Sequence, residues 1–217
     1  MSTDIYMHIP RIDFSDGECF ANAIIKNKKN SFRIISIMSL PDLNALPATL
    51  ELGGGCTMTF LRNEPYLTRV HVAAIPASQG GTLYVPPHWH EEHDELFRVL
   101  QGRLRVMIGD KTRDYVPSDG EIRIRKGMVH SISAFHNEET IFEERTDPMD
   151  IEKELFFRNI LAGGKMTTHP LQAMVVMYSG DMVPALPGHV KWMERGFRAL
   201  LGGFIGPLFG YQVKYKA

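Results

Sequence analysis

Ten consecutive residues, from Pro86 to Glu95, form a dense group of metal-ligating side chains. The stretch reads PPHWHEEHDE and holds three histidines and four carboxylates. If residues 87–90 are extended, His88 and His90 point to the same face, because successive side chains alternate along a strand. Two neutral imidazoles on one face can share a metal ion, and Glu95, at the start of the next expected strand, would add a negatively charged oxygen ligand.

A fourth ligand must come from another segment, and the histidine that opens the expected strand HSISAF is the candidate. It follows the turn at Lys126-Gly127. The simpler interpretation of the ten-residue stretch is a charged loop that water solvates. That interpretation fits residues 91–94, but it does not account for the spacing of the first two histidines and the last glutamate. The predicted metal ligands are therefore His88, His90, Glu95 and His130, with a solvated acidic loop between them.

These residues resemble the two metal motifs of the cupins. The first cupin motif reads glycine, five residues, His-x-His, three or four residues, Glu, six residues, glycine. Here His88-x-His90, Glu95 and Gly102 match the spacings, and Gly81 precedes them with a gap that is one residue longer.

The second cupin motif is glycine, five residues, Pro-x-Gly, two residues, His, three residues, Asn. The chain keeps the Gly-x-x-His core at Gly127 and His130. Arg125 stands at the proline position, the first glycine is displaced to Gly120, and Ala134 stands at the asparagine position. The resemblance covers about residues 68–146. It implies a mainly β fold, the double-stranded β-helix or cupin jelly-roll barrel, with the metal inside the barrel mouth.

The chain divides into three stretches: N-terminal strands and loops over residues 1–65, a strand-rich barrel over 66–146 and a helical C-terminal extension over 147–217. Short alternating runs separated by frequent turns are typical of an antiparallel sandwich or barrel. The expected strands cover residues 32–38, 57–62, 68–75, 94–100, 103–108, 121–125, 130–135 and 140–145.

The extension is expected to begin with a helix that Asp147 caps, with Pro148 at its first position. This helix would run to about Ala162 and end at Gly163-Gly164, and its apolar residues recur at helical spacing. A second expected helix includes residues 171–178, and a third covers about 188–201.

Strand parity also predicts which side chains surround a substrate pocket near the metal. Each candidate shares the parity of a predicted ligand in its own strand. For His136, the turn HNEE favours an alternative in which the strand ends at Phe135 and His136 begins the turn. The candidates are Tyr84, Phe97, Val99 and His136.

Two adjacent carboxylates, Glu143 and Glu144, lie in one expected strand, so one of them must face inward. The inward carboxylate could act as a base in the pocket, or it could pair with an arginine such as Arg123 or Arg145. The sequence leaves both interpretations open.

Charge and composition restrict the partners and the location. The chain of 217 residues carries 24 basic and 25 acidic side chains. It lacks the basic surplus that phosphate binding requires, so we expect a small-molecule substrate and no nucleic acid. Cys19 and Cys56 show neither metal nor disulfide spacing, and the first ten residues lack the apolar core of a signal peptide. Both observations favour a reducing, cytoplasmic location.

The C-terminal extension combines basic and aromatic side chains between Trp192 and Tyr211. Its uncharged run at 199–213 is shorter than the roughly 20 residues of a spanning helix, and Pro207 interrupts it. Such a segment could contact a membrane interface. We favour a lid over the barrel or a dimer contact, and the resemblance to cupins, which are commonly dimeric, implies a homodimer.

A site of three histidines and one glutamate resembles that of the cupin dioxygenases, in which a divalent metal holds an enolic or phenolic substrate beside oxygen. The ligand types alone do not choose among iron, nickel, manganese, copper and zinc. The resemblance implies one ion per chain, with iron favoured. Four protein ligands on an octahedral ion leave two positions. The resemblance thus implies a metal-dependent dioxygenase or oxygenase that acts on a small enolic, phenolic or polyketide-like metabolite.

Two alternatives stay open. The same site supports redox-neutral isomerisation, decarboxylation or cyclisation in secondary metabolism, because a metal ion also stabilises an enolate. The third hypothesis is a non-catalytic cupin that binds a small molecule, and a tightly filled cavity would favour it.

Overall fold

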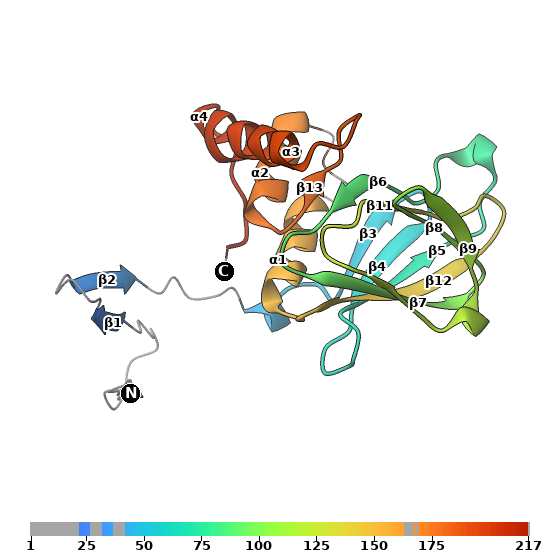
Figure 1. Ribbon diagram of the computed structural model, residues 1–217. Helices are drawn as coiled ribbons and strands as arrows, with labels where there is room; N and C mark the ends of the chain where they lie inside the picture. Colours follow the sequence, from blue (N-terminus) through green and yellow to red (C-terminus); the bar gives the residue numbers. More distant parts are fainter. Residues whose placement is uncertain (1–21, 27–31, 37–41, 163–166, 168, 217) are drawn as a thin grey trace, which may run out of the picture. The chain divides into compact units, whose positions relative to one another are not determined.

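Figure 1 shows the computed structural model, which describes residues 22–26, 32–36, 42–162, 167 and 169–216. The chain forms two compact units, Met1–Leu40 and Pro41–Ala217. In the first unit, β1 (Asn22–Lys26) and β2 (Phe32–Ser36) pair in antiparallel fashion. The predictions about Cys19 and about the first ten residues lie outside the described residues.

The second unit contains two antiparallel sheets and a C-terminal group of helices. One sheet has the strand order β10-β7-β12-β5-β4-β3, and the other has the order β13-β6-β11-β8-β9. Figure 1 shows the helices gathered on one side of the sheets. The predicted mainly β jelly-roll fold with a helical C-terminal part is confirmed. In chain order the strands are β3 (Thr49–Gly53), β4 (Cys56–Phe60), β5 (Thr68–Val72), β6 (Tyr84–Trp89), β7 (Asp94–Gln101), β8 (Leu104–Ile108), β9 (Lys111–Tyr115), β10 (Glu121–Ile124), β11 (His130–Ser133), β12 (Thr140–Asp147) and β13 (Val183–Pro184).

Alternation along the strands builds the hydrophobic core. On β4 the side chains of Cys56, Met58 and Phe60 are buried, and on β10 the same is true of Ile122 and Ile124. The residues between them remain at least partly exposed. These two strands therefore each contribute one apolar face to the interior, where burial of apolar surface stabilises the fold.

Strands β3 and β9 are absent from the sequence prediction, as are β1 and the two-residue β13. Strand β9 has the sequence KTRDY, and β3 has no fully buried side chain. A strand without a buried face lacks the hydrophobic period of two on which the prediction depends. Both strands are supported mainly by pairing, β3 with β4 and β9 with β8.

Strand β6 forms although it contains Pro86 and Pro87, which lack the N–H donor that a sheet ladder uses. Its neighbour β13 pairs only with His88 and Trp89. The two prolines therefore lie beyond the end of the β6–β13 pairing, where β6 needs fewer backbone N–H donors. This arrangement keeps the chain extended into the two histidines of the first motif.

The helices are α1 (Ile151–Ile160), α2 (Pro170–Ser179), α3 (Lys191–Arg198) and α4 (Gly206–Leu208), with a π-helical segment at Ala199–Ile205 between the last two. The predicted cap of the first helix is wrong. Asp147 continues β12 by pairing with Asp94 of β7, and Asp150 caps α1 by accepting from the Lys153 N–H. Pairing with β7 extends β12 through Asp147, the residue that the sequence pattern assigned to the helix cap. The expected stop at residues 163–164 lies outside the described residues.

One buried carboxylate ties α3 to the barrel. Glu194 accepts from the Trp89 indole N–H at 2.8 Å, from the Leu186 N–H at 2.7 Å and from His189 Nδ1 at 3.0 Å. Trp89 lies between the two histidines of the first motif, so this contact fixes the strand that carries them.

A row of apolar side chains on the last helical segments is exposed, including Trp192, Phe204, Leu208 and Phe209. Within the described part of the chain, the helices are too short or too polar to cross a membrane. The lid and dimer-contact interpretations of this segment stay predictions.

The core assignment makes a prediction about two leucines. Leu104 of β8 has 0% exposure, whereas Leu100 of β7 is 38% exposed. We expect Leu104→Ala to lower the free energy of unfolding by about 2–5 kcal/mol, because the substitution removes buried methyl groups and leaves a cavity. The matched control, Leu100→Ala, should cost roughly 1 kcal/mol or less. Urea denaturation measures both, and equal losses would contradict the assignment.

Candidate metal centre

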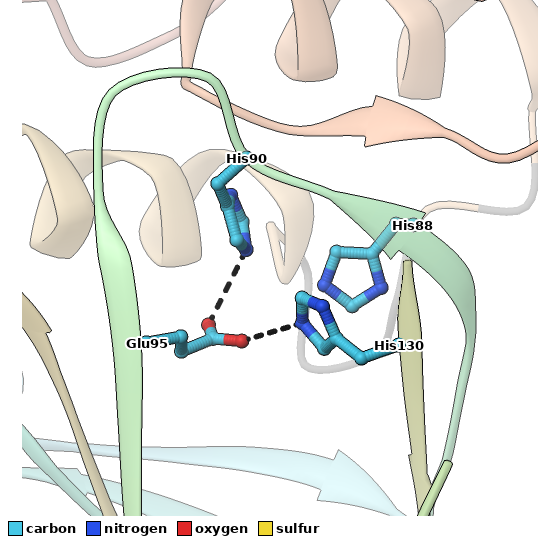
Figure 2. A group of neighbouring side chains, drawn as sticks. All are labelled: His88, His90, Glu95 and His130. Atoms are coloured by element: carbon cyan, nitrogen blue, oxygen red, sulfur yellow. Dashed lines mark hydrogen bonds and ion pairs between the residues drawn. The ribbon is translucent and has the colours of Figure 1, made fainter. Parts of the chain in front are cut away.

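Four buried side chains converge between the two sheets (Figure 2). One ligand atom from each lies within 4.8 Å of the others. His88 lies in β6, and His90 follows directly after the end of that strand. Glu95 lies in β7, and His130 opens β11. The structure brings together all four predicted ligands, which are His88, His90, Glu95 and His130.

Sheet register explains why these residues meet. His130 of β11 lies directly opposite His88 of β6, so their imidazoles are cross-strand neighbours in the five-stranded sheet. Glu95 belongs to the six-stranded sheet, where it pairs with Thr146 of β12. The short turn after β6 carries His90 across to Glu95. The site thus joins the two sheets at one edge.

Main-chain carbonyls fix the orientation of every imidazole. His88 Nδ1 donates to Pro86 O at 2.8 Å, His130 Nδ1 donates to Met128 O at 3.0 Å, and His90 Nδ1 donates to Asp181 O. A carbonyl oxygen only accepts, so each ring carries its proton on Nδ1 and presents the lone pair of Nε2. Metal-ligating histidines are oriented in this way.

The donor set fits a single metal ion. His130 Nε2 lies 2.7 Å from Glu95 Oε2, and His90 Nε2 lies 3.5 Å from Glu95 Oε1. Acceptors at these distances repel one another unless a cation or a proton lies between them. His90 Nε2 is buried and has no hydrogen-bond partner, so it is an orphaned lone pair that a metal ion would satisfy.

Burial also keeps the first histidine neutral. It lowers the pKa of His88 well below the usual range, and the adjacent imidazoles of His130 and His90 add to this effect. Burial opposes ionisation of Glu95 as well, but the Lys153 ammonium and the His90 imidazole outweigh it and hold the pKa of that carboxyl well below its usual value. The result is a neutral imidazole beside an anionic oxygen, which a divalent transition metal prefers.

The loop between the ligands is held by the C-terminal part of the chain. The Asp181 carboxylate accepts from the N–H groups of Glu91 and Glu92, each at 2.8 Å, and of His93 at 3.1 Å. His93 also bonds to Asp181 and to Asp150, and it is buried. The predicted solvated loop is therefore ordered by contacts. No local sequence signal could reveal this, because Asp181 lies about ninety residues away.

A cavity of about 140 Å³ opens onto three of the four side chains, those of His88, His90 and Glu95. Phe97 lines it as predicted, whereas Val99 is buried in the core outside the lining. His136 is exposed because β11 ends at Ser133. The walls are mostly apolar and come from both sheets and from α1 and α2, including Met58, Val85, Phe97, Phe142, Phe156 and Met177.

Tyr84 is 57% exposed and does not line the cavity. Residues His130 and Ile132 of β11 pair with His88 and Val85 of β6, so three steps along β6 oppose two along β11. This irregularity shifts the parity between the histidine and the start of the strand. Val85 therefore lines the cavity in place of Tyr84.

The adjacent carboxylates of β12 have opposite surroundings. Glu143 bonds to Arg69 and Arg98, which lie opposite it in β5 and β7. The predicted arginine partners are different, because Arg145 pairs with Glu121 and Arg123 pairs with Asp94. Cross-strand register, which the sequence does not show, decides these pairs.

Glu144 faces the cavity beside a lysine that sequence reasoning missed. Lys153 Nζ of α1 lies 2.9 Å from Glu95 Oε1 and 3.3 Å from Glu144 Oε1. Burial, together with the nearby Glu95 charge, raises the pKa of Glu144 to about 8 despite the lysine. Burial alone would lower the pKa of Lys153, but the two carboxylates raise it.

Comparisons with known proteins find relatives of part of this chain. Residues 77–142 match the family model of the cupin domain. The probable oxidoreductase patJ of Penicillium expansum is 27% identical over 147 residues, which cover 60% of this chain and 44% of that protein. The probable oxidoreductase virH of Hypocrea virens is 24% identical over 159 residues, covering 67% of this chain and 73% of that protein. The chain spans less than half the length of the patJ proteins that it matches in Penicillium expansum and Aspergillus clavatus.

Among solved structures, the polyketide cyclase RemF from Streptomyces resistomycificus is 24% identical to this chain. The superposition covers 43% of this chain and 66% of that chain with a TM-score of 0.33. A likeness of this size carries no argument about function.

His90→Ala should remove most of the bound metal while the barrel stays folded, because the residue follows β6 and contributes a ligand rather than a core contact. Metal per chain is measured by mass spectrometry, and folding by circular dichroism. The matched control is His136→Ala, which removes an exposed histidine outside the cluster and should leave the metal content unchanged. An unchanged metal content in His90→Ala would show that the ligand assignment is wrong.

Asp181→Asn should weaken metal affinity by about 10- to 100-fold, because the loop that joins His90 to Glu95 loses the carboxylate that orders it. The affinity is obtained by titrating metal-free protein with zinc against a competing chelator. Asp114→Asn, which disrupts an exposed pair with Arg105, is the control and should bind zinc normally. If both variants bound zinc as the parent does, Asp181 would have no role in positioning the ligands.

Proposed function

The chain carries a cupin domain, and on that basis we propose that the protein is a metal-dependent oxidoreductase that uses molecular oxygen to oxidise a small enolic or phenolic metabolite. One observation carries the proposal. Three imidazoles, each fixed by a main-chain carbonyl, present Nε2 lone pairs to one carboxylate at the polar end of an apolar cavity. This is a ligand set with room beside it for a substrate.

The proposed metal for oxidation is iron, with nickel, manganese and copper as alternatives, and zinc would serve only the redox-neutral functions. Imidazole and carboxylate ligands suit all of these ions, but reaction with oxygen needs an ion that changes oxidation state, which zinc does not. A redox-active ion held by the four side chains would supply Lewis acidity and electron transfer to substrate and oxygen.

The side chains of the cavity would orient and shield the substrate. Apolar walls bury its ring and exclude water, which strengthens every charged contact at the polar end. The buried carboxyl of Glu144, whose Oε1 lies 3.3 Å from Lys153 Nζ, is in its ionised form our candidate to accept the proton of an enolic or phenolic hydroxyl. In dioxygenation one molecule of oxygen is consumed per substrate, and both oxygen atoms remain in the product.

The relatives support oxidation, since the patJ and virH proteins are both named probable oxidoreductases. A redox-neutral isomerase, decarboxylase or cyclase would use the same residues without consuming oxygen. A tightly filled cavity would favour the alternative of a non-catalytic binding protein. The cavity beside the four side chains instead has a volume of about 140 Å³, which favours an enzyme. Oxygen consumption is therefore the measurement that separates the two enzymatic functions.

We expect oxygen uptake only when a redox-active ion and a substrate are both present. Metal-free protein is reconstituted separately with each candidate ion and screened in an oxygen electrode against small enols and phenols. The zinc form and the His88→Ala/His90→Ala variant should show background uptake, and His136→Ala should behave as the parent. Conversion of a substrate without oxygen uptake would instead establish redox-neutral chemistry, and no conversion with any ion would reject an enzymatic role for these substrates.

A further inference from the structure

One cation lies at the polar end of the cavity. Lys153 carries the one ammonium or guanidinium group among the described residues that line it, and its side chain is 10% exposed. The lysine belongs to α1, outside the segment that matches the cupin domain. The Asp150 carboxylate caps α1 through the Lys153 N–H at 3.2 Å, which fixes the backbone from which the side chain extends.

The ammonium group has a donor to spare. A lysine has three N–H donors. Within the described part of the chain, its polar contacts are Glu95 Oε1 at 2.9 Å and Glu144 Oε1 at 3.3 Å. At least one donor is therefore left for a ligand in the cavity.

The charges at this end also leave room for an anion. When a divalent ion is bound, its charge and that of Lys153 exceed those of Glu95 and Glu144 by at least one positive charge. An uncompensated charge in an apolar cavity is costly, so a ligand with one negative charge would be favoured.

We propose that Lys153 binds an acidic oxygen of the substrate. The substrate would then be an apolar molecule about the size of one ring, with a single carboxylate or ionised enol at the end that faces the metal. The size follows from the cavity of about 140 Å³, since an engineered apolar cavity of about 150 Å³ holds benzene. This inference rests on the proposed function, because it concerns the ligand of that same site.

A purely structural role for Lys153 is the alternative. In that case the ammonium would only neutralise the two buried carboxylates, and removing it would alter stability without changing the choice of ligand. The two roles differ in what they predict for a charged and a neutral ligand of the same shape.

The test uses benzoate and its neutral counterpart benzamide as probes, with zinc-loaded protein and isothermal titration calorimetry. Zinc excludes turnover, so binding alone is measured. We expect the parent to bind benzoate more tightly than benzamide. Lys153→Met should weaken benzoate binding by about 10- to 100-fold, as expected for the loss of a charge-assisted hydrogen bond, and should change benzamide binding by less than about threefold.

Lys153→Met leaves Glu95 and Glu144 without their ammonium partner, and two further variants control for this effect. Glu144→Gln keeps the lysine and should retain the preference for benzoate. Lys153→Met/Glu144→Gln replaces both ionisable side chains with neutral ones, and it should lose the preference as Lys153→Met does. Zinc per chain and circular dichroism are measured for every variant, so loss of metal or of folding is recognised.

The proposal is overturned if the parent binds the two probes equally, a result that needs no variant. It is also overturned if the folded, zinc-loaded lysine variants keep the benzoate preference undiminished. Failure of the oxidoreductase proposal gives a different result. A protein with the lysine-dependent preference but no oxygen uptake with any ion would retain the anion site and lose the proposed reaction.

Discussion

The mutual repulsion of ligand lone pairs in a buried site is the constraint on which the rest of this structure depends. Three imidazole Nε2 atoms and a carboxylate point into one small volume, and the chain must hold them there. Side chains cannot do this alone, because free rotation would relieve the repulsion. The hydrogen bonds from Nδ1 to the carbonyls of Pro86, Met128 and Asp181 supply the restraint. Two of these carbonyls lie two residues before the histidine itself, so strand geometry restrains those rings locally.

The third restraint comes from the C-terminal part of the chain, which makes the extension part of the site. Asp181 holds His90 through its carbonyl and the following loop through its carboxylate. Glu194 holds Trp89, and α1 supplies Lys153. The contacts of the Asp181 carboxylate, Glu194 and Lys153 involve a charge. Loss of one partner of a buried or partly buried charge is costly. The helices therefore complete the barrel mouth, and a barrel without them would lack one imidazole restraint and one cation.

The sequence predicted what depends on local spacing and failed where register or distant contacts decide. The ligand set followed from strand alternation and the spacing of two motifs. The many short alternating runs predicted an antiparallel sandwich or barrel, and the resemblance to the cupins implied the jelly roll. Tyr84 was misplaced because an irregularity in the pairing of β6 with β11 shifts the parity, and nothing in the sequence marks it. Asp147 was assigned to a helix cap because its pairing with Asp94 in β7 is non-local. Lys153 escaped notice because helical spacing predicts a face and not the cavity that the face meets.

Adjacent residues of β12 show how surroundings rather than residue type decide the role of a carboxylate. Glu143 faces two arginines across the sheet, so its charge is compensated where both arginines also reach water. Glu144 shares one buried lysine with Glu95, and the lysine lies closer to Glu95. One ammonium cannot compensate two buried carboxylates, and the raised pKa of Glu144, about 8, expresses that deficit. A metal ion bound by Glu95 would reverse the balance from a shortage to an excess of positive charge. The proposed ion and substrate anion would thereby be coupled, because the binding of the first would create the charge that attracts the second.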